Sequence, residues 1–331
     1  MSQFPPTGKI LMIRMGAMGD IVHTLPAAAT LRRAFPNAEI DWLVEEHWAA
    51  LLAGNPHVSS VKTLRRRNLP ALLRAVGDLR RRHYDCVIDF QGLMKSAAIA
   101  GLCGAGQVIG FETQALRERP AAIAYQRQVT VPMDAHVVEK NLALAHALGN
   151  SGPPMEIVME FPLPGAAIDM APPFPGDYLA VSPSAGWAAK RWPAEKFAEL
   201  IARVDREMDW PSVVNCGPGE EELAARIVAH ARPERARIVN GNLSTLIGLA
   251  QRARAFVAGD TGPLHIAAAL GTPVVAVFGP TNPRRNGPYS KRSRVVRAAG
   301  VETTYSRSAG GEDIARVTVD EVFHALVEVT A

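Results

Sequence analysis

Short apolar segments alternate with longer segments of helical periodicity along the first half of the chain. The apolar runs predict strands at 9–15, 39–45, 84–90 and 107–111, with a further candidate at 57–64. Helical periodicity predicts helices at 21–35, 69–83, 95–104 and 136–149. Pro26 is expected to kink or delay the first of these helices. Buried strands separated by helices predict a parallel, doubly wound sheet.

A proline-rich stretch interrupts this alternation near the middle of the chain. Seven of the 25 prolines lie between residues 153 and 175, which predicts an interdomain linker with one candidate strand at 155–161. The alternation then restarts, with strands predicted at 177–184, 210–217, 236–241, 255–260 and 272–280. Helices are predicted at 194–207, 219–231, 243–253, 261–271 and 319–329.

The two halves, in a chain of 331 residues, predict two similar α/β domains in tandem. We place them at 1–160 and 161–331, and the last predicted helix either stays in the second domain or crosses back to the first. Ligands of doubly wound sheets bind outside the carboxyl ends of the strands. Two such domains that face each other would place a site in the cleft between them.

The composition fits a protein with a large buried core. Hydrophobic residues make up 48% of the chain, mean hydropathy is +0.03, and no apolar stretch approaches the roughly 20 residues of a membrane span. The amino terminus lacks the charged start, apolar block and cleavage site of a signal peptide. Cys86, Cys103 and Cys216 form no CxxC pair, which is typical of buried thiols in a reducing compartment. We therefore expect a cytosolic protein.

Positive charge is clustered more strongly than the net charge of +4 suggests. One short stretch contains Arg65, Arg66, Arg67, Arg74, Arg80, Arg81 and Arg82. This clustering predicts an anionic partner, and phosphate, a carboxylated sugar, a membrane surface and nucleic acid all stay open at this point.

The segment 255–271 joins a strand, a turn and a helix start with chemistry suited to a diphosphate. Asp260 or Thr261 is expected to cap the helix. A helix start has unpaired N–H groups and a partial positive charge, and it therefore binds anions. Thr261, Gly262 and His265 gather at this point. The alternative interpretation is an ordinary capped helix.

The loop 15–20 follows the first predicted strand and ends in Asp20. It contains only Gly16 and Gly19, whereas the dinucleotide fingerprint GxGxxG needs three glycines, which disfavours a dehydrogenase. Aspartate is a favoured helix N-cap. It is also a residue type that serves as a general base, which here would face the cleft. Both interpretations of Asp20 stay open.

Three further loops follow strands of the second half. The first contains Ser184 and Lys190, and either holds a phosphate or is a solvated surface loop. In the second, Glu220 and Glu221 either hold ribose hydroxyls or are acidic residues in the first turn of a helix. The third, 281–289, is placed to cover a nucleotide. No Asp-x-Asp, HExxH or Cys/His cluster indicates a metal site.

Taken together, these segments resemble the family-nine inverting glycosyltransferases of GT-B fold. The matching segments are KILMIRMGAMGDIVHTLPAA, AEIDWLVEE, YDCVIDFQGLMKSA, IGFETQALRE, AHVVEKNLALA, AAKRWP, GPGEE, GDTGPLHIAAALGTPVVAVFGPTNP and GPY. GDTG-LH is general to the family, whereas HTLPA, DWLVEE, QGLMKSA and HVVEKN point to the lipopolysaccharide heptosyltransferase I branch. The resemblance covers nearly the whole chain and implies two Rossmann-like doubly wound domains that face a cleft.

The resemblance also implies a reaction and its site residues. Heptose would pass from ADP-L-glycero-D-manno-heptose to the Kdo sugar of Kdo–lipid A, with Asp20 as the general base and without a metal or other cofactor. The implied donor contacts are Ser184, Lys190, Glu220 or Glu221, Asp260, Thr261, Gly262, Leu264 and His265. The implied acceptor contacts are Gly19, His23, Arg65, Arg66, Arg67, Lys95 and Arg117. Such an enzyme would lie at the inner face of the inner membrane, with no nucleic-acid partner.

Two other functions remain compatible with the same residues. A related family-nine enzyme, such as heptosyltransferase II, would act on another acceptor. A non-catalytic protein would bind the nucleotide sugar without turning it over. Assays of purified acceptors side by side separate these alternatives.

Overall fold

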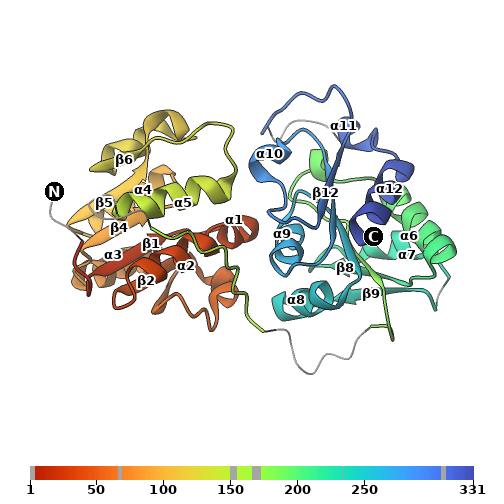
Figure 1. Cartoon of the computed structure of the whole chain (residues 1–331), viewed down its shortest axis with the longest axis horizontal. Helices are drawn as coiled ribbons and strands as arrows, with labels where there is room; N and C mark the ends of the chain where they lie inside the picture. Colours follow the sequence, from red (N-terminus) through yellow and green to blue (C-terminus); the bar gives the residue numbers. More distant parts are fainter. Residues whose placement is uncertain (1–3, 66–68, 150–154, 166–172, 233, 307–310) are drawn as a thin grey trace. The chain divides into compact units, whose positions relative to one another are not determined.

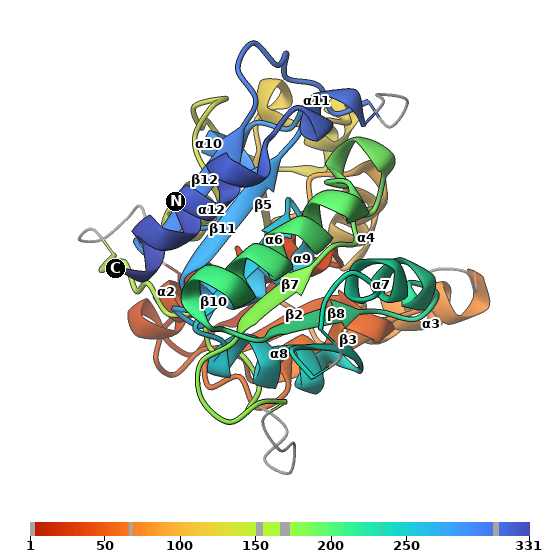
Figure 2. The same ribbon diagram turned by 90° about the vertical axis from the view of Figure 1, so that its right-hand side faces the viewer.

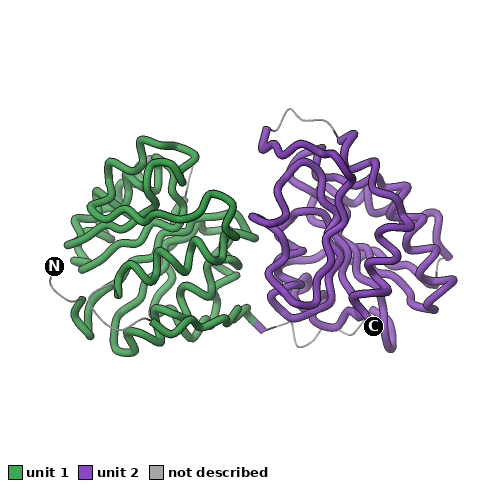
Figure 3. The backbone as a smooth tube through the Cα atoms, turned by 45° about the horizontal axis from the view of Figure 1, so that its top comes forward, with its two compact units in different colours: residues 1–164 green, residues 165–331 purple. Residues whose placement is uncertain are grey.

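The computed structural model describes residues 4–65, 69–149, 155–165, 173–232, 234–306 and 311–331. The chain divides into two compact units, residues 1–164 and 165–331 (Figures 1 and 3). Each unit is built on a parallel six-stranded sheet with helices packed against it. The predicted fold class of two doubly wound, Rossmann-like α/β domains is therefore confirmed.

The sheet of unit 1 has the strand order β3-β2-β1-β4-β5-β6. Its strands are β1 (Lys9–Ile13), β2 (Glu39–Glu45), β3 (Ser60–Leu64), β4 (Cys86–Asp89), β5 (Gln107–Phe111) and β6 (Arg127–Val129). Its α-helices are α1 (Met18–Val22), α2 (Leu25–Ala34), α3 (Leu69–Arg81), α4 (Met94–Leu102) and α5 (Val137–Leu148). Three 3₁₀ helices complete its described part: η1 (Glu46–Leu52), η2 (Thr113–Ala115) and η3 (Arg119–Ala124).

The sheet of unit 2 has the strand order β12-β11-β10-β7-β8-β9. Its strands are β7 (Leu179–Ser182), β8 (Ser212–Cys216), β9 (Ala236–Asn240), β10 (Ala255–Gly259), β11 (Val274–Phe278) and β12 (Ser293–Arg297). Its helices are η4 (Ala188–Lys190), α6 (Ala194–Met208), α7 (Glu221–Val228), α8 (Leu243–Arg252), α9 (Gly262–Ala269), α10 (Pro283–Asn286), α11 (Glu312–Ala315) and α12 (Val319–Thr330).

Both sheets have the same topology. In each, the first strand lies between the second and the fourth, so the order of strands reverses between β1 and β4 and between β7 and β10. Doubly wound folds open a crevice at this switch point, at the carboxyl ends of the strands, and ligands bind there. The loops after β1, β4, β7 and β10 therefore lie where a ligand is expected to bind.

Burial on both faces explains why the central strands read as continuous apolar runs. Strands β1 and β11 are fully buried along nearly their whole length. Helix α6 contributes Phe197, Leu200, Ile201 and Val204, at helical spacing, to the core of unit 2. Helices α6 and α12 pack side by side on one face of that sheet, and α8 and α9 pack together on the other (Figures 1 and 2).

The segment predicted as one helix at 21–35 forms two helices. Helix α1 ends at Val22, and α2 begins at Leu25 with Pro26 in its first turn. The N–H that proline lacks has no helical partner at that position, so Pro26 starts a new helix and does not kink an existing one.

The candidate strand at 155–161 is absent, and this prediction was wrong. The backbone N–H of Val158 donates to Thr30 Oγ1 at 3.1 Å, and Arg33 pairs with Glu156 at 3.1 Å. Side chains of α2 therefore take the place of a neighbouring strand.

The sequence did not predict two of the strands, and it left the position of the last helix open. Strands β6 and β12 were not predicted, because their sequences, RQV and SRVVR, are polar. Both lie at sheet edges, where an apolar run is not required. The last helix, α12, packs on α6, β11 and β12 of unit 2.

Candidate functional site

A buried arginine and a half-exposed carboxylate meet where β1 ends. Arg14 directly follows β1 and is only 7% exposed, and its NH2 lies 2.7 Å from Oδ1 of Asp20. The Asp20 side chain is 40% exposed, and its Oδ2 accepts the backbone N–H of Ala17 at 3.3 Å. The N-cap of α1 is Ala17, so Asp20 is the third residue of the helix and not its cap.

The loop after β4 fixes the backbone on either side of this arginine. Gln91 Oε1 accepts the N–H groups of Met15 at 3.0 Å and Gly16 at 3.3 Å. The carbonyl of Phe90 accepts NH1 of Arg14. Hydrogen bonds therefore join the loop after β1 to the loop after β4.

A buried carboxylate, Asp89, orders the loop after β4. Its oxygens accept the N–H groups of Gln91 at 2.9 Å and Gly92 at 3.1 Å, the hydroxyl of Tyr125 at 2.7 Å and that of Ser96 at 2.8 Å. Burial raises the pKa of Asp89, and these hydrogen bonds oppose the rise. No part of this carboxylate reaches the surface, so its role is to hold the loop.

A polar pocket opens beside the Asp20 loop. Its lining residues are Met15, Gly16, Ala17, Glu45, His47, Trp48, Gln91, Leu93, Lys95 and Glu118. The rings of His47 and Trp48 on η1 lie 4.6 Å apart, and Lys95 contributes a cation from α4. An aromatic wall with a few charged groups around it is suited to a polar, ring-shaped ligand.

The predicted acceptor residues are only partly brought together. Lys95 lines the pocket, and Gly19 lies in α1 next to Asp20. Arg117 is exposed on the loop before η3. His23 is buried, and its ring packs edge-on against His136 with 5.1 Å between centroids.

Arg65 is held by a neighbouring carboxylate. Its Nε and NH2 donate to the two oxygens of Glu46 at 2.7 and 2.9 Å. Arg66 and Arg67 lie outside the described residues. The arginine cluster is therefore described only at Arg65, which already has an anionic partner.

In unit 2 the switch point holds an ion-paired lysine. Nζ of Lys190 lies 2.5 Å from Oδ2 of Asp260 and 3.3 Å from its backbone oxygen. The Lys190 side chain is 17% exposed, whereas that of Asp260 is 6% exposed. The ammonium also lies 5.8 Å from the centre of the Trp187 ring. The cation of this pair therefore faces solvent more than the anion does.

Asp260 is the centre of a small buried network. Thr281 Oγ1 donates to its Oδ2 at 2.9 Å, and His265 Nε2 lies 3.6 Å from its Oδ1. Burial alone would raise the pKa of Asp260, but His265 and the charge of Lys190 outweigh it and lower the pKa to about 2. The carboxylate is ionised at neutral pH and holds Lys190 in place.

Two glycines let the lysine loop approach the ends of β10 and β11. A Cβ on Gly259 would lie 2.6 Å from the carbonyl oxygen of Lys190, and one on Gly279 would lie 2.1 Å from that of Ala189. Any larger residue at either position would push η4 away from the sheet. The contact between Lys190 and Asp260 depends on this close approach.

The predicted anion site lies at the start of α9. Thr261 occupies the N-cap position, and its hydroxyl donates to the carbonyl of Gly259 at 3.2 Å without accepting an N–H of the helix among the described residues. Gly262 begins α9, and Leu264 and His265 are buried behind it. The N–H groups of the first turn have no acceptor inside a helix, so an anion can bind them.

The remaining predicted donor residues differ in their present partners. Ser184 Oγ is buried and has no hydrogen-bond partner among the residues that the structure describes. Glu220 accepts the N–H of Gly217 at 2.7 Å, and Glu221 accepts the side-chain amide of Asn240 at 2.8 Å. Ser184 therefore has an unused hydroxyl, whereas each glutamate already stabilises its own surroundings.

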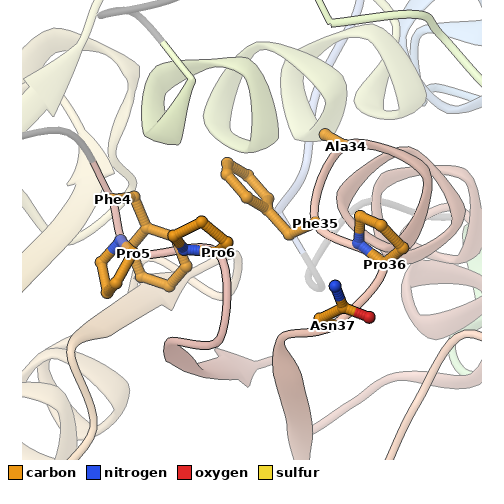
Figure 4. Close-up of a pocket in the computed structure, with 7 residues that line it drawn as sticks. All are labelled: Phe4, Pro5, Pro6, Ala34, Phe35, Pro36 and Asn37. Atoms are coloured by element: carbon orange, nitrogen blue, oxygen red, sulfur yellow. The ribbon is translucent and has the colours of Figure 1, made fainter.

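A second pocket lies near the amino end of β1, away from these loops (Figure 4). It is lined by Phe4, Pro5, Pro6, Ala34, Phe35, Pro36 and Asn37. No ionisable side chain is among these residues, so the pocket has no acid, base or charge with which to act on a ligand.

Two features are absent from the described residues. Nowhere in the described part of the chain do three His, Cys, Asp or Glu residues lie where they could share a metal ion. None of the described helices has the length and apolarity needed to cross a membrane.

The sequence matches the family Glycosyltransferase family 9 (heptosyltransferase) over residues 72–310. The chain belongs to this family. It is therefore a glycosyltransferase, as the sequence predicted. Lipopolysaccharide heptosyltransferase 1 of Pseudomonas aeruginosa is 34% identical to this glycosyltransferase over 303 residues, which cover 86% of the chain and 82% of the relative. The Escherichia coli K12 protein of the same name is 30% identical over 309 residues, or 88% and 93% of the two chains.

Solved structures agree with the family assignment. The E. coli heptosyltransferase WaaC with ADP matches this glycosyltransferase with a TM-score of 0.78 at 27% identity, over 97% of the chain and 99% of that structure. The E. coli ADP-heptose lps heptosyltransferase II matches with a TM-score of 0.78 at 22% identity, over 97% and 98%. The predicted GT-B fold is confirmed.

Sequence reasoning missed three residues of the site and the contact made by a fourth. Arg14, Gln91 and Trp48 shape the Asp20 loop and its pocket, and Thr281, the first residue of the predicted loop 281–289, holds Asp260. Each lies within a few residues of the carboxyl end of a strand. Ligands of doubly wound sheets bind at these ends, so a position just after a strand is the sequence signal that marks these residues.

Proposed function

We propose that this glycosyltransferase moves heptose from ADP-L-glycero-D-manno-heptose to Kdo of Kdo–lipid A, the inner core of lipopolysaccharide. The observation that carries the proposal is the Asp20 carboxylate, fixed by Arg14 and half exposed beside a polar pocket. The similarity to lipopolysaccharide heptosyltransferase 1 over most of the chain supports this donor and acceptor.

The donor would bind unit 2. The E. coli relative has a structure with ADP-2-deoxy-2-fluoro heptose, which supports an ADP-sugar here. Lys190 and the start of α9 would hold the diphosphate, with Thr261, Gly262 and the unused hydroxyl of Ser184 as further donors. Glu220 or Glu221 would exchange its present contact for a ribose hydroxyl, and Asp260, Leu264 and His265 would support this surface from behind.

In the reaction, a hydroxyl of Kdo attacks the anomeric carbon of heptose as its proton passes to the Asp20 carboxylate. The bond between that carbon and the diphosphate oxygen breaks, and ADP leaves with the electron pair. Lys190 and the helix start stabilise the negative charge that builds on the leaving diphosphate. Attack from the side opposite the leaving group inverts the anomeric configuration. With Lys190 and the helix start in these roles, the proposed reaction needs no metal ion.

The acceptor would bind unit 1. Lys95 and Arg117 are suited to the Kdo carboxylate, and the wall formed by His47 and Trp48 to a sugar ring. Arg65, Arg66 and Arg67 would meet the phosphorylated lipid, while Gly19 and His23 would shape the loop that carries Asp20. A lipid-linked acceptor places the enzyme at the inner face of the inner membrane.

Mass spectrometry of purified acceptors incubated with ADP-heptose tests the proposal. The expected result is one heptose added to Kdo–lipid A, none to an acceptor that already bears the first heptose, and an unchanged rate in EDTA. Transfer only to the longer acceptor would assign the enzyme to the heptosyltransferase II reaction. Loss of transfer in EDTA, restored by magnesium, would contradict the proposed stabilisation of the diphosphate.

A further inference from the structure

The guanidinium of Arg14 has few partners for a group so deeply buried. NH1 donates to the carbonyl of Phe90, NH2 faces Oδ1 of Asp20 at 2.7 Å, and Nε has no partner in the described part of the chain. Among the described residues, Asp20 is the only carboxylate in salt-bridge contact with it. A buried cation is costly unless it is paired. The ion pair with Asp20 therefore offsets part of the cost of burying the Arg14 guanidinium.

The backbone of Arg14 is held firmly on β2. Its N–H donates to the carbonyl of Leu43 at 3.2 Å, and its own carbonyl accepts Nε1 of the buried Trp42 at 3.1 Å. The planar guanidinium then offers its donors in a fixed fork. Asp20, by contrast, lies on a helix of five residues and is half exposed. The rigid member of the pair is the arginine.

We propose that Arg14 is a positioning residue for Asp20. It holds Oδ1 from inside the protein and thereby presents Oδ2 to the acceptor hydroxyl. The proposal rests on the role of Asp20 as the general base. Arg14 then acts on the rate only through Asp20, which separates this role from a general contribution to folding.

Two substitutions at Arg14 test the role of its charge. Arg14→Gln removes the charge and leaves a shorter polar side chain, and it should lower kcat about tenfold or more. Arg14→Lys keeps a cation on a flexible stem, and its kcat should fall by less than tenfold. The donor KM should change no more than about threefold in either variant, because Lys190 and α9 belong to the other unit.

The control is Arg32→Gln. Arg32 is another partly buried arginine of unit 1 that donates to backbone carbonyls, those of Pro36 and Ala38, at 3.0 and 2.8 Å. It makes no contact with Asp20 in the described structure, so its loss should leave kcat within about threefold of the wild type. Melting temperatures of all variants show how much each loses in stability.

The deciding measurement repeats Arg14→Gln in the Asp20→Asn background. If Arg14 acts through Asp20, the double variant should turn over as fast as Asp20→Asn alone. A further tenfold loss, equal losses in the Gln and Lys variants, or normal kcat in Arg14→Gln would overturn the proposal. Should Arg14→Gln not fold, a tenfold or larger loss in a folded Arg14→Lys overturns it instead. Near-normal turnover of Asp20→Asn by itself would reject the base role, which is a separate failure.

Discussion

At the residue scale, the two units place opposite charges at the carboxyl ends of their central strands. In unit 1 the buried partner is the cation Arg14, and the more exposed one is the anion Asp20. In unit 2 the buried partner is the anion Asp260, and the more exposed one is the cation Lys190. The residues proposed as the proton acceptor and as the diphosphate-binding cation therefore each rest on a buried counter-charge.

The Asp260 network predicts how stability depends on pH. The pKa of this carboxyl is lowered to about 2 in the folded protein, so its contribution to stability is complete above the unfolded pKa of about 4 and disappears as pH falls towards 2. The shift corresponds to about 2 kcal/mol. In Asp260→Asn, the free energy of unfolding should therefore fall less steeply between pH 4 and 2 than in the wild type.

Denaturant unfolding at several pH values measures this difference. Asp177→Asn is the matched control, because Asp177 is an exposed carboxylate of the same unit, and its profile should follow that of the wild type. Parallel wild-type and Asp260→Asn profiles would show that Lys190 and His265 do not stabilise the ionised form of Asp260.

At the element scale, the arginine cluster before α3 remains a prediction for the acceptor. Replacing Arg65, Arg66 and Arg67 with alanine should raise the acceptor KM roughly tenfold, which corresponds to about 1.4 kcal/mol of lost charged contacts. The donor Kd should not change. The wild-type acceptor KM should also rise with salt, since screening acts over about 8–10 Å.

A control for this triple variant lies on α3 itself. Arg80 and Arg81 are exposed near the end of the helix, and Arg81 pairs with Asp78. Replacing both with alanine should leave the acceptor KM within about twofold. If the Arg65–Arg67 variant has a normal KM, the cluster is a solvated surface, and the acceptor relies on Lys95 and Arg117.

The elements differ in how well the sequence predicted them. Strands β2 and β5 match their predicted bounds, and the residues inside each strand are buried while its first residue is only partly so. Strands β6 and β12 were missed because edge strands need no apolar pattern. The false strand at 155–161 has an apolar sequence but binds side chains of α2. Hydrophobic periodicity indicates which residues are buried. It predicts a false strand where the segment contacts the side chains of a helix and does not pair with another strand.

At the scale of the whole molecule, the sequence predicted more of the fold than of the site. The alternation of strands and helices was enough for two doubly wound sheets, and family motifs pointed to GT-B. Motifs also pointed to Asp20 and Lys190. They did not show that Arg14 and Asp260 lie beneath them, because those pairings follow from strand order and from glycines that admit a close contact. A local sequence pattern contains neither the strand order nor the close contacts between distant loops.

The most direct test of the central claim is the turnover of Asp20→Asn with ADP-heptose and Kdo–lipid A. Loss of a general base costs about 10²–10⁴ in rate, so kcat should fall by that factor while the donor Kd stays within a few-fold. Asp85→Asn is the control, because Asp85 binds the N–H of Lys9 at the other end of the sheet. Near-normal kcat in Asp20→Asn would contradict the account and leave Asp20 as a residue that stabilises the start of α1.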